Sequence, residues 1–320
     1  MNKVFIIHEN STWLAPLREA LDELSTPYTE WHLDKGFFDF SRPPPHGIFY
    51  NRMSASSHTR GHVYAPEYTA SVLAWLESHG RRVINTSRAL ELEISKVKQY
   101  AALTKFGIRV PNTMVAVGPE AVREAAKQFG FHLMLKPNRG GKGAGVQLFQ
   151  SIKALDGYLD SGIYDAGRDG TTLVQQYIEA ADKSIIRCEF VGGKFLYAVK
   201  VDTSKGFELC PADVCQIEDL ACPVGETPGP IFEILKDFAH PNIAKYESFL
   251  NANGIEVSGI EMIIDADGAA WTFDVNTNTN YNDDAETLAN ITGTPKAGMR
   301  AVAKFLDAEL AKQKPAVAAE

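Results

Sequence analysis

The sequence predicts an α/β protein in which a parallel sheet comes first and antiparallel strand pairs follow. Within the first 84 residues, short apolar runs alternate with segments of helical periodicity, an order typical of parallel sheets covered by helices. Farther along, apolar runs flank Gly192-Gly193 and Asp267-Gly268, as in antiparallel hairpins. A length of 320 residues is enough for two or three packed units.

In the first unit, we expect strands at 4–7, 28–33, 47–50 and 82–84, with helices at 12–24 and 65–79. Ligands of such sheets bind beyond the carboxyl ends of the strands, and a polar, hydroxyl-rich segment with two arginines follows the third strand. One interpretation is a solvated loop. The other, which we favour, is an anion or carboxylate pocket that holds the acceptor or donor substrate and not ATP, formed by Asn51, Arg52, Ser54, Ser56, Thr59 and Arg60.

The rest of the chain shows further elements. One long helix is expected from Ser87 to Phe106, closed by Gly107, with Lys96 within it. Other helices are expected at 120–130, 152–159, 230–239, 243–253 and 298–311. Strands are expected at 133–136, 146–149, 172–177, 184–190, 194–201, 257–264 and 270–275.

Composition argues against several classes of partner. The net charge of −8 disfavours nucleic acid, and no apolar run reaches the ~20 residues that cross a bilayer. Residues 1–7 are too short for a signal peptide, so we expect a cytoplasmic protein with reduced thiols. Cys210, Cys215 and Cys222 cluster without the CxxC spacing of zinc sites, so we favour structural thiols over a metal site.

A lysine and a glycine-rich loop form the first functional signal. Lys136 ends an apolar strand, and four glycines follow between residues 140 and 145 together with Lys142. Glycines allow backbone N–H groups to turn toward an anion, and the lysines add positive charge. The spacing matches neither the Walker A motif nor the dinucleotide fingerprint. A mobile hairpin turn is the alternative to polyphosphate binding.

Two carboxylates and an amide form the second signal. The turn at Asp267-Gly268 lies midway between Glu261 and Asp274, so antiparallel pairing should place these residues opposite each other. Asn276 projects from the same face as Asp274. Such oxygen ligands suit Mg²⁺, although acidic residues at a strand end are more often simply solvated.

Taken in order, these motifs resemble those of ATP-grasp enzymes, in the branch similar to the RimK-type glutamate ligases. The resemblance covers roughly residues 48–310. It rests on five motifs: Ser95-Lys96 before Gly107-Ile108-Arg109-Val110-Pro111; Lys136-Pro137 with the glycine loop; Val174-Gln175-Gln176-Tyr177-Ile178; Ser184-Ile185-Ile186-Arg187-Cys188; and Gly259-Ile260-Glu261 with Asp274-Val275-Asn276. It implies an ATP-grasp fold with an N-terminal parallel α/β (pre-ATP-grasp) domain at 1–88. A small lid subdomain with its linking helix would occupy 89–178, a C-terminal subdomain with the metal site 179–312, and a disordered tail 313–320.

The resemblance also implies a role for each matching residue. Lys96 and Lys136 would contact the ATP phosphates from two sides, and Arg187 would stabilise the transferred phosphoryl group with help from Lys200. The loop that would close over the phosphates contains Gly140, Gly141, Lys142, Gly143 and Gly145. The residues that would meet adenine and ribose are Gln175, Gln176, Tyr177, Ile178 and Asp182. Mg²⁺ would bind Glu261, Asp274 and Asn276, and Asn278 and Asn280 would face the acceptor.

The expected activity is ATP-dependent ligation of a carboxylate to an amine through an acyl phosphate, with release of ADP and phosphate. A small-molecule kinase and a non-catalytic ATP- or metabolite-binding protein are the alternatives. The expected cofactors are ATP and Mg²⁺, with Mn²⁺ as a substitute. The expected partners are small-molecule or peptide carboxylates and amines, with no nucleic acid and no membrane, and a homo-oligomer is compatible with the sequence.

Overall fold

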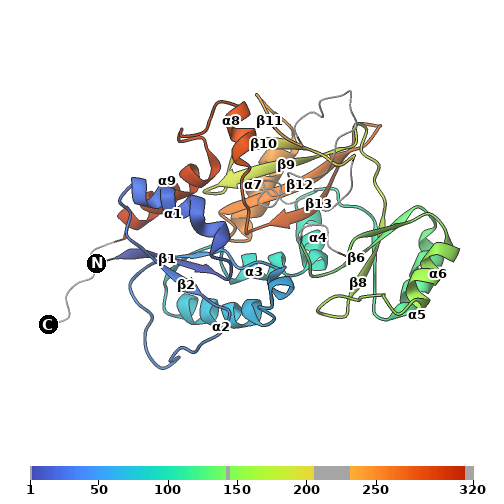
Figure 1. Cartoon of the computed structure of the whole chain (residues 1–320), viewed down its shortest axis with the longest axis horizontal. Helices are drawn as coiled ribbons and strands as arrows, with labels where there is room; N and C mark the ends of the chain where they lie inside the picture. Colours follow the sequence, from blue (N-terminus) through green and yellow to red (C-terminus); the bar gives the residue numbers. More distant parts are fainter. Residues whose placement is uncertain (1, 142–144, 205–230, 314–320) are drawn as a thin grey trace.

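The computed structural model describes residues 2–141, 145–204 and 231–313, and these ranges contain three β-sheets (Figure 1). The first is parallel, as predicted, and its strand order is β2-β1-β3-β4. The second and third are antiparallel, with the orders β5-β8-β6-β7 and β11-β10-β9-β12-β13. The strands are β1 (Lys3–His8), β2 (Tyr28–His32), β3 (Gly47–Asn51), β4 (Arg82–Ile84), β5 (Thr113–Ala116), β6 (Leu133–Pro137), β7 (Gln147–Phe149), β8 (Thr172–Gln176), β9 (Ser184–Val191), β10 (Lys194–Asp202), β11 (Phe232–Leu235), β12 (Val257–Ile264) and β13 (Ala270–Asn276).

Helices cover these sheets and bury their apolar faces. Along β1, Val4 and Ile6 pack with helices α1 and α9 on one face, whereas Phe5 and Ile7 pack with α2 on the other. Each fully buried aliphatic side chain of this kind contributes about 1.5–3 kcal/mol. The helices are α1 (Ala15–Glu23), α2 (Ala65–Ser78), α3 (Ser87–Glu93), α4 (Lys96–Thr104), α5 (Pro119–Phe129), α6 (Ile152–Asp160), α7 (Asn242–Ala252), α8 (Asp283–Leu288) and α9 (Gly298–Ala311).

The antiparallel sheets have their own cores. Helices α5 and α6 pack on the sheet of β5–β8, at the right of Figure 1. Helices α3, α4 and α7 share a core with β9, β10, β12 and β13. The hairpin turn predicted between β9 and β10 is present, and both Gly192 and Gly193 have positive φ there.

Two predicted helices are wrong. The long helix 87–106 is broken into α3 and α4, because Ser95 adopts an extended conformation and caps α4 by accepting from the N–H of Lys98. The side-chain oxygen of Asn138, in the loop after β6, accepts from Ser95 Oγ and from the N–H of Val97, which stabilises the break.

The second error is the helix predicted at 230–239, where β11 pairs with β10 instead. This pairing satisfies backbone groups along the edge of β10, which outweighs the local preference.

Cys188 is buried inside the third sheet. The prediction for Cys210, Cys215 and Cys222 falls outside the described residues, as does the predicted tail from residue 314 onward. In the described part of the chain, every helix is too short or too polar to cross a membrane.

Candidate functional site

A cavity of about 430 Å³ is lined by residues from both antiparallel sheets, from the loop after β3 and from the start of α4. The loop after β3, the loop after β6, the end of β8 and the strands β9, β12 and β13 all contribute side chains. Most of the residues predicted to bind ATP and metal therefore face one space, although they are distant in the sequence.

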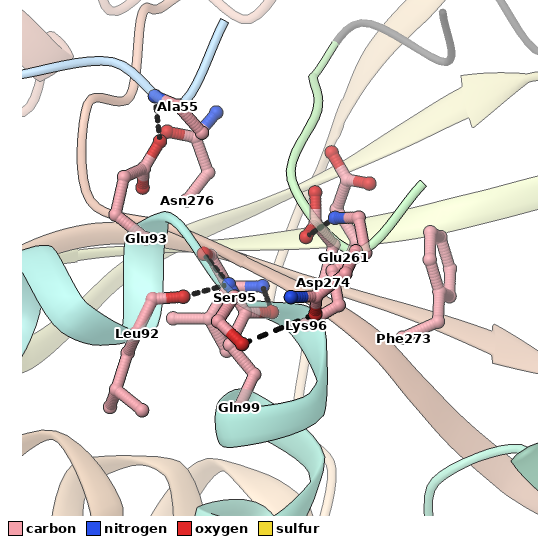
Figure 2. A network of polar contacts seen from close by, with 12 residues as sticks. Ala55, Leu92, Glu93, Ser95, Lys96, Gln99, Glu261, Phe273, Asp274 and Asn276 are labelled. Atoms are coloured by element: carbon pink, nitrogen blue, oxygen red, sulfur yellow. Dashed lines mark hydrogen bonds and ion pairs between the residues drawn. The ribbon is translucent and has the colours of Figure 1, made fainter. Parts of the chain in front are cut away.

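Lys96 is the first residue of α4, and its ammonium group forms an ion pair with Asp274 Oδ1 (Figure 2). Burial alone would lower the pKa of Lys96, but the Asp274 carboxylate beside it, together with Tyr100 and Glu261, outweighs this, and the pKa is raised. The break between α3 and α4 directs this lysine into the cavity, so the lysine remains charged beside the carboxylates of Asp274 and Glu261.

Lys136 lies at the end of β6 and is only 5% exposed. Its Nζ lies 5.5 Å from the ring centre of Tyr100 and 5.7 Å from that of Phe273, and it has no ion-pair partner among the described residues. Burial and the nearby Lys96 lower the pKa of Lys136 to about 7. An anion in the cavity would restore the charge of this ammonium group.

Arg187, on β9, is held by three partners. Its Nε donates to Glu189 Oε1 at 2.5 Å, its Nη1 to Glu261 Oε1 at 2.8 Å, and its Nη2 to Thr279 Oγ1 at 2.7 Å. The guanidinium group lies against Gly259, where an added Cβ would come within 2.6 Å of Arg187 Nη2. The glycine therefore provides the space in which the arginine is oriented toward the cavity.

Glu261 and Asp274 are direct partners in the β12–β13 ladder, so the predicted register is confirmed. Both carboxylates and Asn276 line the cavity (Figure 2). Burial raises the pKa of Glu261, Arg187 opposes this shift, and the Asp274 carboxylate adds to it. Two carboxylates this close favour a cation between them.

The side-chain oxygen atoms of Glu261, Asp274 and Asn276 fit Mg²⁺. Glu261 Oε1 accepts from Arg187 and Asp274 Oδ1 from Lys96, so within the described residues the second oxygen of each carboxylate makes no hydrogen bond. Asn276 Oδ1 accepts from the N–H of Asn278 at 2.9 Å. The described residues contain no cluster of three or more His, Cys, Asp and Glu able to hold a metal. Mg²⁺ needs only one or two carboxylates, because phosphate and water complete its octahedron.

The end of β8 forms another wall, to which Gln175, Gln176, Tyr177 and Ile178 all contribute. The Gln175 amide donates to Tyr100 Oη and Thr113 Oγ1, so its side chain is held by the protein. Apolar side chains, which suit the faces of a planar base, line the cavity at Met134, Val146, Ile185, Ile263 and Phe273.

Neutral polar groups line the remaining side of the cavity, at Ser54, Ser56, Asn278 and Asn280. Arg52 is not part of the lining. Its Nη2 donates to the Thr279 carbonyl at 3.1 Å and to Asn280 Oδ1 at 2.9 Å. Arg52 thus supports, from outside the cavity, the loop Asn276–Asn280, here called the asparagine loop.

Other predicted residues lie away from the cavity lining. Asn51 donates to the Asn85 carbonyl, Thr59 donates to the Ser56 carbonyl, and Arg60 binds Glu9. Lys200 forms an ion pair with Asp182 at 2.7 Å, so neither of these two predicted residues faces the cavity. Gly140 and Gly141 line it, Gly145 does not, and Lys142 and Gly143 lie outside the described residues.

Sequence reasoning missed Glu93 and Trp13, which both line the cavity. The sequence gives no signal for Glu93, because it predicts one continuous helix through this residue. Trp13 follows β1 in the position where parallel sheets bind ligands, and this was the available signal.

Comparison with known proteins agrees with this geometry. Residues 94–207 match the RimK-like ATP-grasp domain family. Probable alpha-L-glutamate ligases of Vibrio atlanticus and Methanococcoides burtonii are each 31% identical over 140 residues, which is 43% of this chain and 46% of theirs. The match thus spans less than half the length of these relatives.

Solved structures resemble the whole described fold. A RimK domain ATP-grasp protein of Sphaerobacter thermophilus has a TM-score of 0.64 at 20% identity, covering 95% of this chain and 98% of its own. The D-cycloserine synthetase DcsG has a TM-score of 0.61 at 19% identity, with coverage of 96% and 99%. PsnB, an ATP-grasp ligase complexed with a minimal precursor, has a TM-score of 0.64 at 15% identity, with coverage of 96% and 99%.

The protein therefore has the ATP-grasp fold, as the motifs predicted. More particularly, residues 94–207 are similar to the RimK-like ATP-grasp domain.

Proposed function

We propose that the protein is an ATP-dependent ligase that joins a carboxylate to an amine through an acyl phosphate. The observation that carries the proposal is the convergence of Lys96, Lys136 and Arg187 with Glu261 and Asp274 on one cavity. Phosphoryl transfer requires positioned positive charge around the phosphates, and these residues supply it without covalent chemistry.

Each part of the cavity has a role in this proposal. ATP places its base against the apolar wall and the end of β8, and its phosphates extend toward Lys136 and the loop from Gly140. Glu261, Asp274 and Asn276 would hold Mg²⁺, which would neutralise phosphate charge. Arg187 stabilises the charge that develops on the transferred phosphoryl group, since its own partners hold it in place.

The substrates occupy the neutral polar side, beside Ser54, Ser56, Asn278 and Asn280. A carboxylate oxygen attacks the γ-phosphorus and ADP departs, which gives an acyl phosphate. The amine then attacks the acyl carbon, phosphate departs with the C–O bond electrons, and the amine loses a proton. Relatives named probable glutamate ligases, and PsnB complexed with its precursor peptide, make amino acids and short peptides the first substrates to test.

The test measures ADP, free phosphate and product mass with a panel of amino acids, small acids and short peptides. A ligase produces ADP and phosphate in equal amounts together with a new C–N bond. A kinase produces ADP and a phosphorylated product without free phosphate. Glu261→Gln sets the background from contaminating ATPases. If no member of a broad panel raises ADP release above that background, the proposal fails.

A further inference from the structure

Glu93 connects two loops that are far apart in the sequence. It is the last residue of α3, three residues before Lys96. Its Oε1 accepts from the N–H of Ala55 at 3.2 Å, and its Oε2 accepts from the N–H and Oγ1 of Thr277 at 2.7 and 3.0 Å. Figure 2 shows the carboxylate beside Ala55, close to Asn276.

The two loops form the neutral polar side of the cavity. Ala55 lies between Ser54 and Ser56, and Thr277 lies between Asn276 and Asn278. Ala55 is 3% exposed and Thr277 is 1% exposed, so the donors on Glu93 are shielded from water. A buried N–H that loses its acceptor is left without a hydrogen bond and destabilises the fold, which ties both loops to this one carboxylate.

The same segment also holds the metal-site strand. Gln99 accepts from the N–H of Val275 at 3.0 Å and donates to the Val275 carbonyl at 2.8 Å. Lys96 binds Asp274. Gln99 and Lys96 thus fix β13 against α4, whereas Glu93 extends that support to the serine loop after β3.

We propose that Glu93 is a positioning residue, which locks the Ser54–Ser56 loop against the Asn276–Asn280 loop so that the amine substrate is held beside the acyl phosphate. The locking of the two loops by Glu93 follows from the contacts alone, whereas its effect on the amine substrate rests on the proposed function. Glu93 is not assigned a contact with substrate.

Hydrogen exchange measured by mass spectrometry tests the loops without any substrate. In Glu93→Gln, one acceptor oxygen becomes an NH2 group, which cannot accept from the N–H of Ala55 or of Thr277. Peptides covering residues 53–57 or 275–280 should therefore exchange at least tenfold faster. Peptides from α4 should be unchanged. Glu91→Gln is the matched control, because Glu91 lies on the same helix with a side chain that is 51% exposed and paired with Arg88. Equal exchange in Glu93→Gln and Glu91→Gln would overturn the proposal.

Two amines test the functional part. Hydroxylamine is small and traps an acyl phosphate without being positioned, so hydroxamate formation and the KM for ATP should stay within twofold of the parent. With the best amino acid amine of the panel, kcat/KM should fall at least tenfold. An equal loss with both amines would mean that Glu93 is merely structural and would contradict the proposal.

Glu93→Asp provides a second variant if Glu93→Gln folds poorly. The shorter carboxylate can reach only one loop, so one of the two loop peptides should exchange faster and the other should not. Unchanged exchange in both peptides would overturn the proposal. If the parent forms neither hydroxamate nor amide, the proposed function fails, while the exchange result still decides the role of Glu93.

Discussion

Replacing Lys136 with methionine should stabilise the protein without nucleotide and abolish its response to Mg-ATP. Methionine has similar bulk but no charge to bury. The expectation follows from the position of Lys136, which is 5% exposed and without an ion-pair partner among the described residues. The same ammonium group should be needed once polyphosphate is present.

The magnitude follows from the pKa of Lys136. Lowering it from 10.5 to about 7 costs about 5 kcal/mol, at about 1.4 kcal/mol per pH unit. Methionine removes this cost but loses the attraction to the rings of Tyr100 and Phe273, about 0.5–2 kcal/mol each. We therefore expect Lys136→Met to unfold with a free energy higher by about 1–4 kcal/mol at pH 6.

The pH dependence has a definite sign. Below pH 7, both folded and unfolded chains carry the proton on Lys136, and the full burial cost is present. Between pH 7 and 10.5 the unfolded chain keeps a proton that the folded chain has released, so the stability of the parent rises with pH. Between pH 6 and pH 9 this rise amounts to about 2.7 kcal/mol, so most or all of the advantage of Lys136→Met should be lost by pH 9.

Urea unfolding at pH 6, 7.5 and 9, with and without Mg-ATP, measures both effects. At a concentration 100 times its Kd, ATP should stabilise the parent by about 2.7 kcal/mol and Lys136→Met not at all. Lys98→Met, at an exposed position on α4, is the control and should behave as the parent. A variant that is less stable than the parent at pH 6, or that keeps the ATP shift, would refute the reasoning.

Three further predictions concern the carboxylate pair, its arginine and the asparagine loop. Asp274→Asn should keep the fold but reduce ADP formation at least a hundredfold, with partial recovery in Mn²⁺; recovery of full activity in Mg²⁺ would contradict the metal assignment. Gly259→Ala should displace Arg187, destabilise the protein by about 1–3 kcal/mol in urea and lower ADP formation; a neutral result would show that Arg187 needs no such space. Arg52→Lys should raise the KM for the carboxylate or the amine while the KM for ATP stays near that of the parent, because Arg52 supports Thr279 and not the nucleotide side; a selective rise in the KM for ATP would reverse this assignment.

Local patterns in the sequence were sufficient for much of the site. The turn at Asp267-Gly268 sets the register of its own hairpin, so the pairing of Glu261 with Asp274 could be predicted from spacing. The parallel order of the first sheet likewise follows from alternating strands and helices close together in the chain. These features depend on contacts between residues that lie within a few tens of positions of each other in the chain. Such contacts can be inferred directly from the pattern of the sequence.

The tertiary structure alone decided which charged groups face the cavity. Arg52 donates to a loop 227 residues away and Lys200 forms an ion pair with Asp182, although the sequence predicts both Arg52 and Lys200 to be site residues. Glu93 acquires its role from Ala55 and Thr277, and α4 begins where it does because Asn138 supports the break. The reason is physical: a buried polar group must find a partner wherever the fold supplies one, and local sequence patterns do not specify partners brought together from distant segments.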